Sequence, residues 1–172
     1  MRELPHEALS MEQERMWFLS HLYGDTAALH EHRAVWIDGE LDVEKLKRAA
    51  EIIVRRHEIL RTVFADGEGG PRQIVLPESA LPFHVLALPP GAAAWDEPAL
   101  RLAQEEICRP IAVAPHPPWR LSLIRSTAHR HLLVLTMHHI ISDGDCSTGL
   151  FFRELAALYA APRPEQAAGL PE

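Results

Sequence analysis

An apolar run that ends in two adjacent histidines constrains the fold of this chain more than any other stretch. Residues 132–137 are of strand length and rich in residues that favour β-strands. His138 and His139 follow directly, and Asp143-Gly144 is a turn signal. Within residues 147–159, apolar side chains recur at helical spacing. The pattern predicts strand, loop and helix, with ionisable groups at the strand's carboxyl end, where open α/β sheets place ligands.

The chemistry of the two histidines is limited by their adjacency. Neighbouring side chains on a strand point to opposite faces, so His138 and His139 cannot easily meet on one small ligand. One imidazole can face a cleft as a general base near neutral pH, while the other packs inward. Asp143, across the turn, is suited to brace the loop. The alternative is a pair of strand-end histidines that only form hydrogen bonds.

Composition narrows the class of protein. The 172 residues suffice for one domain or one large subdomain, and the apolar share of 47% fits a globular core. Asp and Glu outnumber Lys and Arg by 24 to 17, which argues against a nucleic-acid partner. No apolar run approaches membrane-spanning length, and the first residues lack the apolar core of a signal peptide. The two cysteines, Cys108 and Cys146, indicate no disulfide framework. We therefore expect the chain to be located in the reducing cytoplasm.

The remaining sequence predicts an alternation of helices and strands. Ser10 with Gln13 forms a capping box for a first helix, and Asp42 caps a second helix. The expected helices are residues 10–21, 42–57, 96–108 and 147–160. The expected strands are residues 33–38, 61–65, 73–76, 83–88, 119–126 and 131–137, with 66–70 as a hairpin turn and 110–118 extended along the surface.

Other candidate sites carry weaker signals. His30 and His32 are two residues apart on an expected strand, but neither Cys-x-x-Cys nor His-Glu-x-x-His accompanies them, so scattered histidines are favoured over zinc. Cys146 follows a turn, with no feature that would lower the pKa of a nucleophilic thiol. No phosphate-binding glycine loop is present, so no bound cofactor or metal is predicted.

Three stretches together resemble one family. The sequence His138-His139-Ile-Ile-Ser-Asp143-Gly144 resembles the HHxxxDG signature of condensation domains of nonribosomal peptide synthetases. Residues 9–19, Leu-Ser-Met-Glu-Gln-Glu-Arg-Met-Trp-Phe-Leu, are similar to the family's first motif. Residues 56–64, Arg-His-Glu-Ile-Leu-Arg-Thr-Val-Phe, match the second motif, RHExLRTxF, at every fixed position. The resemblance spans residues 4–159, nearly the whole chain.

The resemblance implies a fold and a reaction. The implied fold is an α/β (α+β) lobe similar to chloramphenicol acetyltransferase, with a mixed, mostly antiparallel sheet flanked by helices. Residues 1–160 would be the amino-terminal subdomain of a condensation domain, and residues 161–172 a linker toward a missing carboxyl-terminal subdomain. The implied reaction forms an amide between aminoacyl thioesters, which donor and acceptor peptidyl carrier proteins present on phosphopantetheine arms.

The resemblance also implies roles for the motif residues. His139 would take the proton of the attacking amine or hold the amine in line, and the backbone N–H of Gly144 would help to bind the oxyanion. His138 and Asp143 would hold the loop in shape. In the family the motif aspartate pairs with an arginine, for which Arg56 and Arg61 are both candidates, because a buried arginine needs a carboxylate.

Three departures from the family pattern leave other functions open. Asp145-Cys146 precede Ser147, where the family usually has one residue, and Leu29-His30 and Arg109-Pro-Ile-Ala112 replace other family residues. An altered loop beside the histidines could change the substrate or mark lost activity. The alternatives are a free-standing acyltransferase and a non-catalytic docking or scaffold module.

Overall fold

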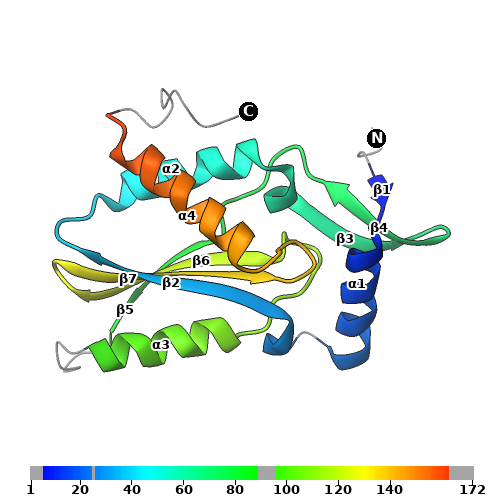
Figure 1. The fold of residues 1–172 in the computed structure, drawn as a ribbon, viewed down its shortest axis with the longest axis horizontal. Coiled ribbons are helices and arrows are strands. Elements are labelled where there is room, and N and C mark those ends of the chain that lie inside the picture. Colours follow the sequence, from blue (N-terminus) through cyan, green and yellow to red (C-terminus); the bar gives the residue numbers. More distant parts are fainter. Residues whose placement is uncertain (1–5, 25, 89–95, 163–172) are drawn as a thin grey trace.

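The structure, a computed structural model, describes residues 6–24, 26–88 and 96–162. One antiparallel sheet, one mixed sheet and four α-helices make up the described fold (Figure 1). The helices are α1 (Met11–Tyr23), α2 (Val43–Arg56), α3 (Asp96–Cys108) and α4 (Asp145–Ala160), with short 3-10 helices η1 (Ala27–Leu29) and η2 (Glu58–Arg61). The strands are β1 (His6–Ala8), β2 (His30–Asp38), β3 (Thr62–Gly67), β4 (Gly70–Val75), β5 (Phe83–Ala87), β6 (Trp119–Thr127) and β7 (Arg130–His138).

The larger sheet has the strand order β2-β7-β6-β5. β7 lies inside this sheet and pairs antiparallel with both β2 and β6, whereas β5 runs parallel to β6 at the edge. Every residue of β7 after Arg130 is buried. The mixed, mostly antiparallel sheet flanked by helices is the fold class that the sequence predicted.

Helices cover both faces of this sheet, which explains the continuous apolar run in β7 (Figure 1). On one face, Leu132 and Val134 pack with Ala99 and Ala103 of α3. On the other face, Leu133 and Leu135 belong to the larger core that α2 and α4 complete. Successive β7 side chains thus enter different cores.

The smaller sheet, with order β1-β4-β3, lies beside α1 at one end of the molecule (Figure 1). The predicted capping box is confirmed, because Ser10 Oγ accepts the Gln13 N–H at 3.2 Å and Gln13 Oε1 accepts the Ser10 N–H at 2.9 Å. The hairpin is also confirmed, but its turn is narrower than expected, because strand pairing continues to Gly67 opposite Gly70.

Several expected boundaries were wrong in ways that matter for the site. β2 begins at His30 rather than residue 33, and α4 begins at Asp145 rather than residue 147. β1 was not predicted. The segment 110–118 is not wholly a surface segment, since Ile111 and Val113 are buried and the Val113 carbonyl accepts the Phe64 N–H at 3.0 Å. The predicted linker lies almost entirely outside the described residues, which stop at 162.

Within the described ranges, no helix is both long and apolar enough to cross a membrane. Cys108 and Cys146 are exposed free thiols.

Candidate active site

The end of β7 and the start of α4 form the candidate site. After His138 the chain turns, with the Ile141 N–H donating to the His138 carbonyl at 3.0 Å. Gly144 closes the turn at φ 55° and ψ −130°, a backbone conformation that side chains other than glycine's disfavour. Asp143 and Gly144 therefore bring the chain from β7 into α4 within a few residues of the histidines.

His138 is fully buried and serves the structure of the turn. Its Nδ1 accepts the Ile140 N–H at 3.0 Å, so in the neutral ring the proton lies on Nε2. Nε2 then donates to Ser20 Oγ at 3.0 Å, and the Ser20 hydroxyl donates to the Met16 carbonyl at 2.9 Å. Burial above all, and then the neighbouring His30 and His139, lower the pKa of His138 from 6.5 to about 4. His138 is thus a neutral link between β7 and α1.

His139 has the opposite exposure and tautomer. Its Nδ1 lies 2.7 Å from the Ser142 carbonyl, which can only accept, so in the neutral ring Nδ1 carries the proton and Nε2 keeps a lone pair. The side chain is 43% exposed and lines an open hollow of about 640 Å³ between α1 and the loop. An oriented imidazole with a free Nε2 beside a hollow is the geometry that a general base requires.

Glu31 of β2 is a neighbour of the base that the sequence did not reveal. Its Oε1 lies 3.6 Å from His139 Nε2. Its Oε2 lies 3.8 Å from the position that a Cβ would take at Gly144. Glu31 reaches this place because it pairs with Met137 in the β2–β7 register. No motif marks it, and only the strand register would have shown it.

The predicted pairing of Asp143 with an arginine is wrong. Asp143 is exposed, and its backbone N–H donates to Ser147 Oγ at 2.8 Å. Arg61 donates instead to the Leu76 carbonyl at 2.6 Å and to Glu58 at 3.0 Å. Asp143 lines the hollow between α1 and the loop, whereas Arg56 of the second motif lies at the α2–α4 contact, 3.7 Å from Glu154.

A different carboxylate, Glu154 of α4, pairs with the second motif. Glu154 is buried, and its two oxygens lie 3.7 Å from Arg56 Nε and 2.7 Å from His57 Nε2. Both partners come from the end of α2 and are partly exposed. This contact fixes α4 against α2 and so holds the helix that follows the HHxxxDG loop.

The extra residues before Ser147 have a structural place. Asp145 is the first residue of α4 and accepts a hydrogen bond from Arg33 of β2 at 2.7 Å. Cys146 is exposed and free. The segment that departs from the family pattern thus carries an ion pair between β2 and α4.

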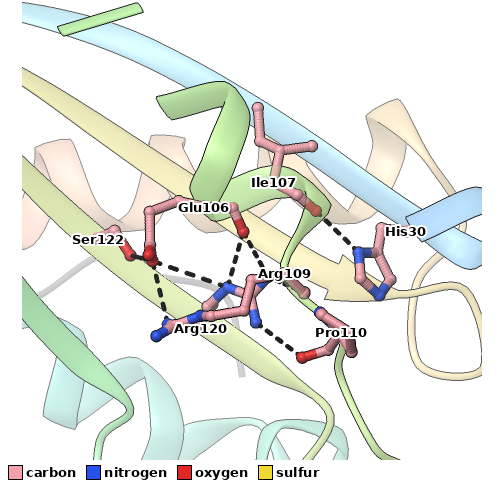
Figure 2. A network of polar contacts seen from close by, with 7 residues as sticks. All are labelled: His30, Glu106, Ile107, Arg109, Pro110, Arg120 and Ser122. Carbon is pink, nitrogen blue, oxygen red and sulfur yellow. Dashed lines mark hydrogen bonds and ion pairs between the residues drawn. The ribbon is translucent and has the colours of Figure 1, made fainter. Parts of the chain in front are cut away.

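A second polar network lies on the α3 face of the sheet, and Figure 2 shows its residues. Arg120 of β6 donates to the Glu106 and Arg109 carbonyls and, at 3.2 Å, to the Pro110 carbonyl. Ser122 Oγ donates to the Glu106 carboxylate at 2.8 Å. Burial and, next, Arg109 lower the pKa of Arg120 to about 10, so it stays cationic at neutral pH. The network ties the end of α3 to β6.

His30 extends this region toward the site. Its Nδ1 donates to the Ile107 carbonyl at 2.9 Å, and its ring lies 6.4 Å from that of His138 (Figure 2 shows the first contact). Among the described residues, no group of three His, Cys, Asp or Glu side chains is placed to hold a metal ion. Through its hydrogen bond to Ile107, His30 connects α3 with the start of β2, close to His138.

The comparison with known families decides the affiliation. The profile of the family described as "Condensation domain" matches residues 5–171. The chain belongs to the condensation domain family. His138, His139, Asp143 and Gly144, which resemble the family's HHxxxDG signature, lie at the end of β7 and in the loop that follows it.

Individual relatives agree with this membership. Chondramide synthase cmdD of Chondromyces crocatus is 41% identical over 93% of the chain, and tyrocidine synthase 3 of Brevibacillus parabrevis is 36% identical over 88%. The first condensation domain of the calcium-dependent antibiotic synthetase, solved with a substrate analogue, superposes with a TM-score of 0.81 at 25% identity over 98% of the chain.

The chain corresponds to only part of these proteins. It spans 4% of chondramide synthase cmdD, 2% of tyrocidine synthase 3 and 40% of the solved condensation domain chain. The chain thus includes the HHxxxDG loop, but it is less than half as long as that solved chain.

We predict that Glu154→Ala destabilises this chain by about 2 kcal/mol, because it leaves Arg56 and His57 without their buried carboxylate. The expected loss is smaller than for a fully buried ion pair, since both partners can reach water. Asp143→Ala is the matched control and should change the free energy of unfolding by no more than about 0.5 kcal/mol. Urea denaturation of both variants measures this, and a larger effect at Asp143 would contradict the pairing described above.

We also predict that His138 makes stability depend on pH. The pKa of His138 is about 4 in the folded chain against 6.5 for an ordinary histidine, so the unfolded chain binds more protons between these values. Stability from the neutral ring is complete above pH 6.5 and falls toward pH 4, by up to about 1.4 kcal/mol per pH unit. In His138→Asn, whose Oδ1 can still accept the Ile140 N–H, this part of the slope should vanish. Equal slopes for both proteins would rule out the effect.

Proposed function

We propose that this chain is the amino-terminal part of a condensation domain that joins two carrier-bound thioesters through an amide bond in nonribosomal peptide synthesis. The observation that carries the proposal is that His139, whose ring is oriented through Nδ1, lines an open hollow in a chain of the condensation domain family. A base in this position suits an acceptor amine, which must lose protons to become an amide nitrogen.

The proposed mechanism assigns one task to each motif residue. The α-ammonium group of the acceptor gives one proton to Nε2 of His139, which the Ser142 carbonyl holds in the required tautomer. The neutral amine then attacks the donor thioester carbonyl, and the C–S bond breaks. The donor arm leaves as a thiol, because its sulfur takes the second proton that the nitrogen loses. The Gly144 N–H is the proposed donor to the oxyanion, and His138 keeps the turn in shape through Ser20 and Ile140.

The proposed partners follow from the same reaction. Donor and acceptor peptidyl carrier proteins would deliver the substrates on phosphopantetheine arms, and the domain itself would bind no cofactor. The hollow between α1 and the loop supports delivery of substrates on such arms, because it leaves His139 accessible from the surface. We propose that the carboxyl-terminal subdomain supplies the opposite wall of the substrate channel.

We predict that the 172-residue chain alone does not condense, because alignment of two tethered substrates needs both walls of the channel, and alignment can supply about 7–11 kcal/mol of the barrier reduction. Product is expected when a separately expressed carboxyl-terminal subdomain and both loaded carriers are added, and mass spectrometry detects it. Condensation by the chain alone would favour a free-standing acyltransferase. No product from the combined subdomains would favour a scaffold module.

The same chain should associate with itself at high concentration. Met11, Phe18, Leu22 and Tyr23 of α1 are all largely exposed and form an unusual number of large apolar groups for one surface helix. The solution mass, measured over a concentration series, should rise with concentration. In the control variant Phe18→Ser, which removes one of these apolar groups, the mass should rise less. An unchanged monomer mass would contradict it.

We predict that His139→Ala in the complete domain lowers the rate of amide formation by about 100- to 10,000-fold, the usual contribution of a general base. The fold should survive, since the side chain is partly exposed at the surface. His129→Ala, a change of an exposed histidine beyond the other end of β7, is the control and should leave the rate unaltered. Turnover by His139→Ala near that of the unmodified domain would remove the proposed role.

A further inference from the structure

Glu31 and His139 face each other with two hydrogen-bond acceptors. In the neutral form of His139, Nδ1 carries the proton and donates to the Ser142 carbonyl, so Nε2 presents a lone pair to the Glu31 carboxylate. The distance of 3.6 Å between Nε2 and Oε1 is longer than a hydrogen bond. Two acceptors at this separation are best satisfied by a third group that donates to both.

The Glu31 carboxylate is accessible to such a donor. Arg33, two residues along the same face of β2, binds Asp145 at 2.7 Å and so does not neutralise Glu31. The other oxygen of Glu31 lies beside Gly144, at an ordinary van der Waals distance of 3.8 Å from the position that a Cβ would take there. The Glu31 side chain is 35% exposed, so a substrate can reach it.

We infer that Glu31 and His139 together bind the amine of the acceptor substrate in its ammonium form. This inference rests on the proposed function and names the counter-ion of the substrate. An ammonium has enough N–H groups to donate to Oε1 and Nε2 at once, and its charge matches the carboxylate. A hydroxyl acceptor has one O–H and no charge, so it can satisfy only one of the two groups.

Proton transfer follows from this arrangement. The ammonium nitrogen passes one proton to Nε2 of His139, which leaves a neutral amine with a free lone pair and an imidazolium. The amine keeps an N–H donated to Glu31, and the carboxylate stabilises the imidazolium beside it. No atom or electron is required beyond those of the acceptor, His139 and Glu31. Glu31 is thus a substrate-binding residue that selects amines over hydroxyl acceptors.

The test compares two soluble acceptors in the complete domain, formed by this chain and its carboxyl-terminal subdomain. One is an aminoacyl pantetheine thioester, and the other carries a hydroxyl in place of the α-amine. Glu31→Gln should raise the KM of the amine by about 10- to 100-fold, the usual effect of a hydrogen bond to a charged group, and leave the KM of the hydroxyl acceptor unchanged. Glu40→Gln, the same charge change at an exposed residue beyond the other end of β2, is the control and should alter neither KM.

The binding affinities of both acceptors can be measured by calorimetry with analogues in which a stable amide replaces the thioester. These affinities separate the inference about Glu31 from the proposed function. A preference for the amine that Glu31→Gln abolishes, without product in any reaction, would support the Glu31 site and reject the proposed function. Product formation with an equal KM before and after Glu31→Gln would support the function and overturn the inference. Equal losses for both acceptors in Glu31→Gln would also overturn it, because they would show a purely structural role.

Discussion

The antiparallel pairing of β2 with β7 determines where the groups of the site lie. His30 pairs with His138 and Glu31 with Met137, so successive β2 residues face different sides of the sheet. Glu31 and Arg33 consequently reach the start of α4, whereas His30 reaches the end of α3. A shift of this register by one residue would exchange these faces and remove the carboxylate from His139.

The two motif histidines illustrate how a strand end separates structure from chemistry. His138 is buried, neutral and hydrogen-bonded on both ring nitrogens, while His139 is 43% exposed and its Nε2 lies 3.6 Å from Glu31. Their difference arises from position alone, since the side chains are identical. The low pKa of His138 and the accessible Nε2 of His139 are two results of the same turn of the chain.

The sequence predicted local features well and long-range pairs poorly. The capping box at Ser10, the cap at Asp42 and the paired strands β6 and β7 follow from short patterns and were confirmed. The partner of Arg56 could not be predicted in this way, because it depends on how α4 packs against α2. Glu154 looked like an ordinary helix residue, and Glu31 was hidden for a similar reason, since a register is a property of two strands.

The position of His139 at the end of the most buried strand has a mechanical consequence. β7 has a neighbouring strand on each edge and a helical layer on each face, so its carboxyl end cannot shift without disturbing both cores. The imidazole therefore follows directly after a strand that is packed on all sides, and its orientation is established when the chain folds. Any opening or closing around a substrate must come from α1 or from a surface opposite the hollow, moving toward a stationary base.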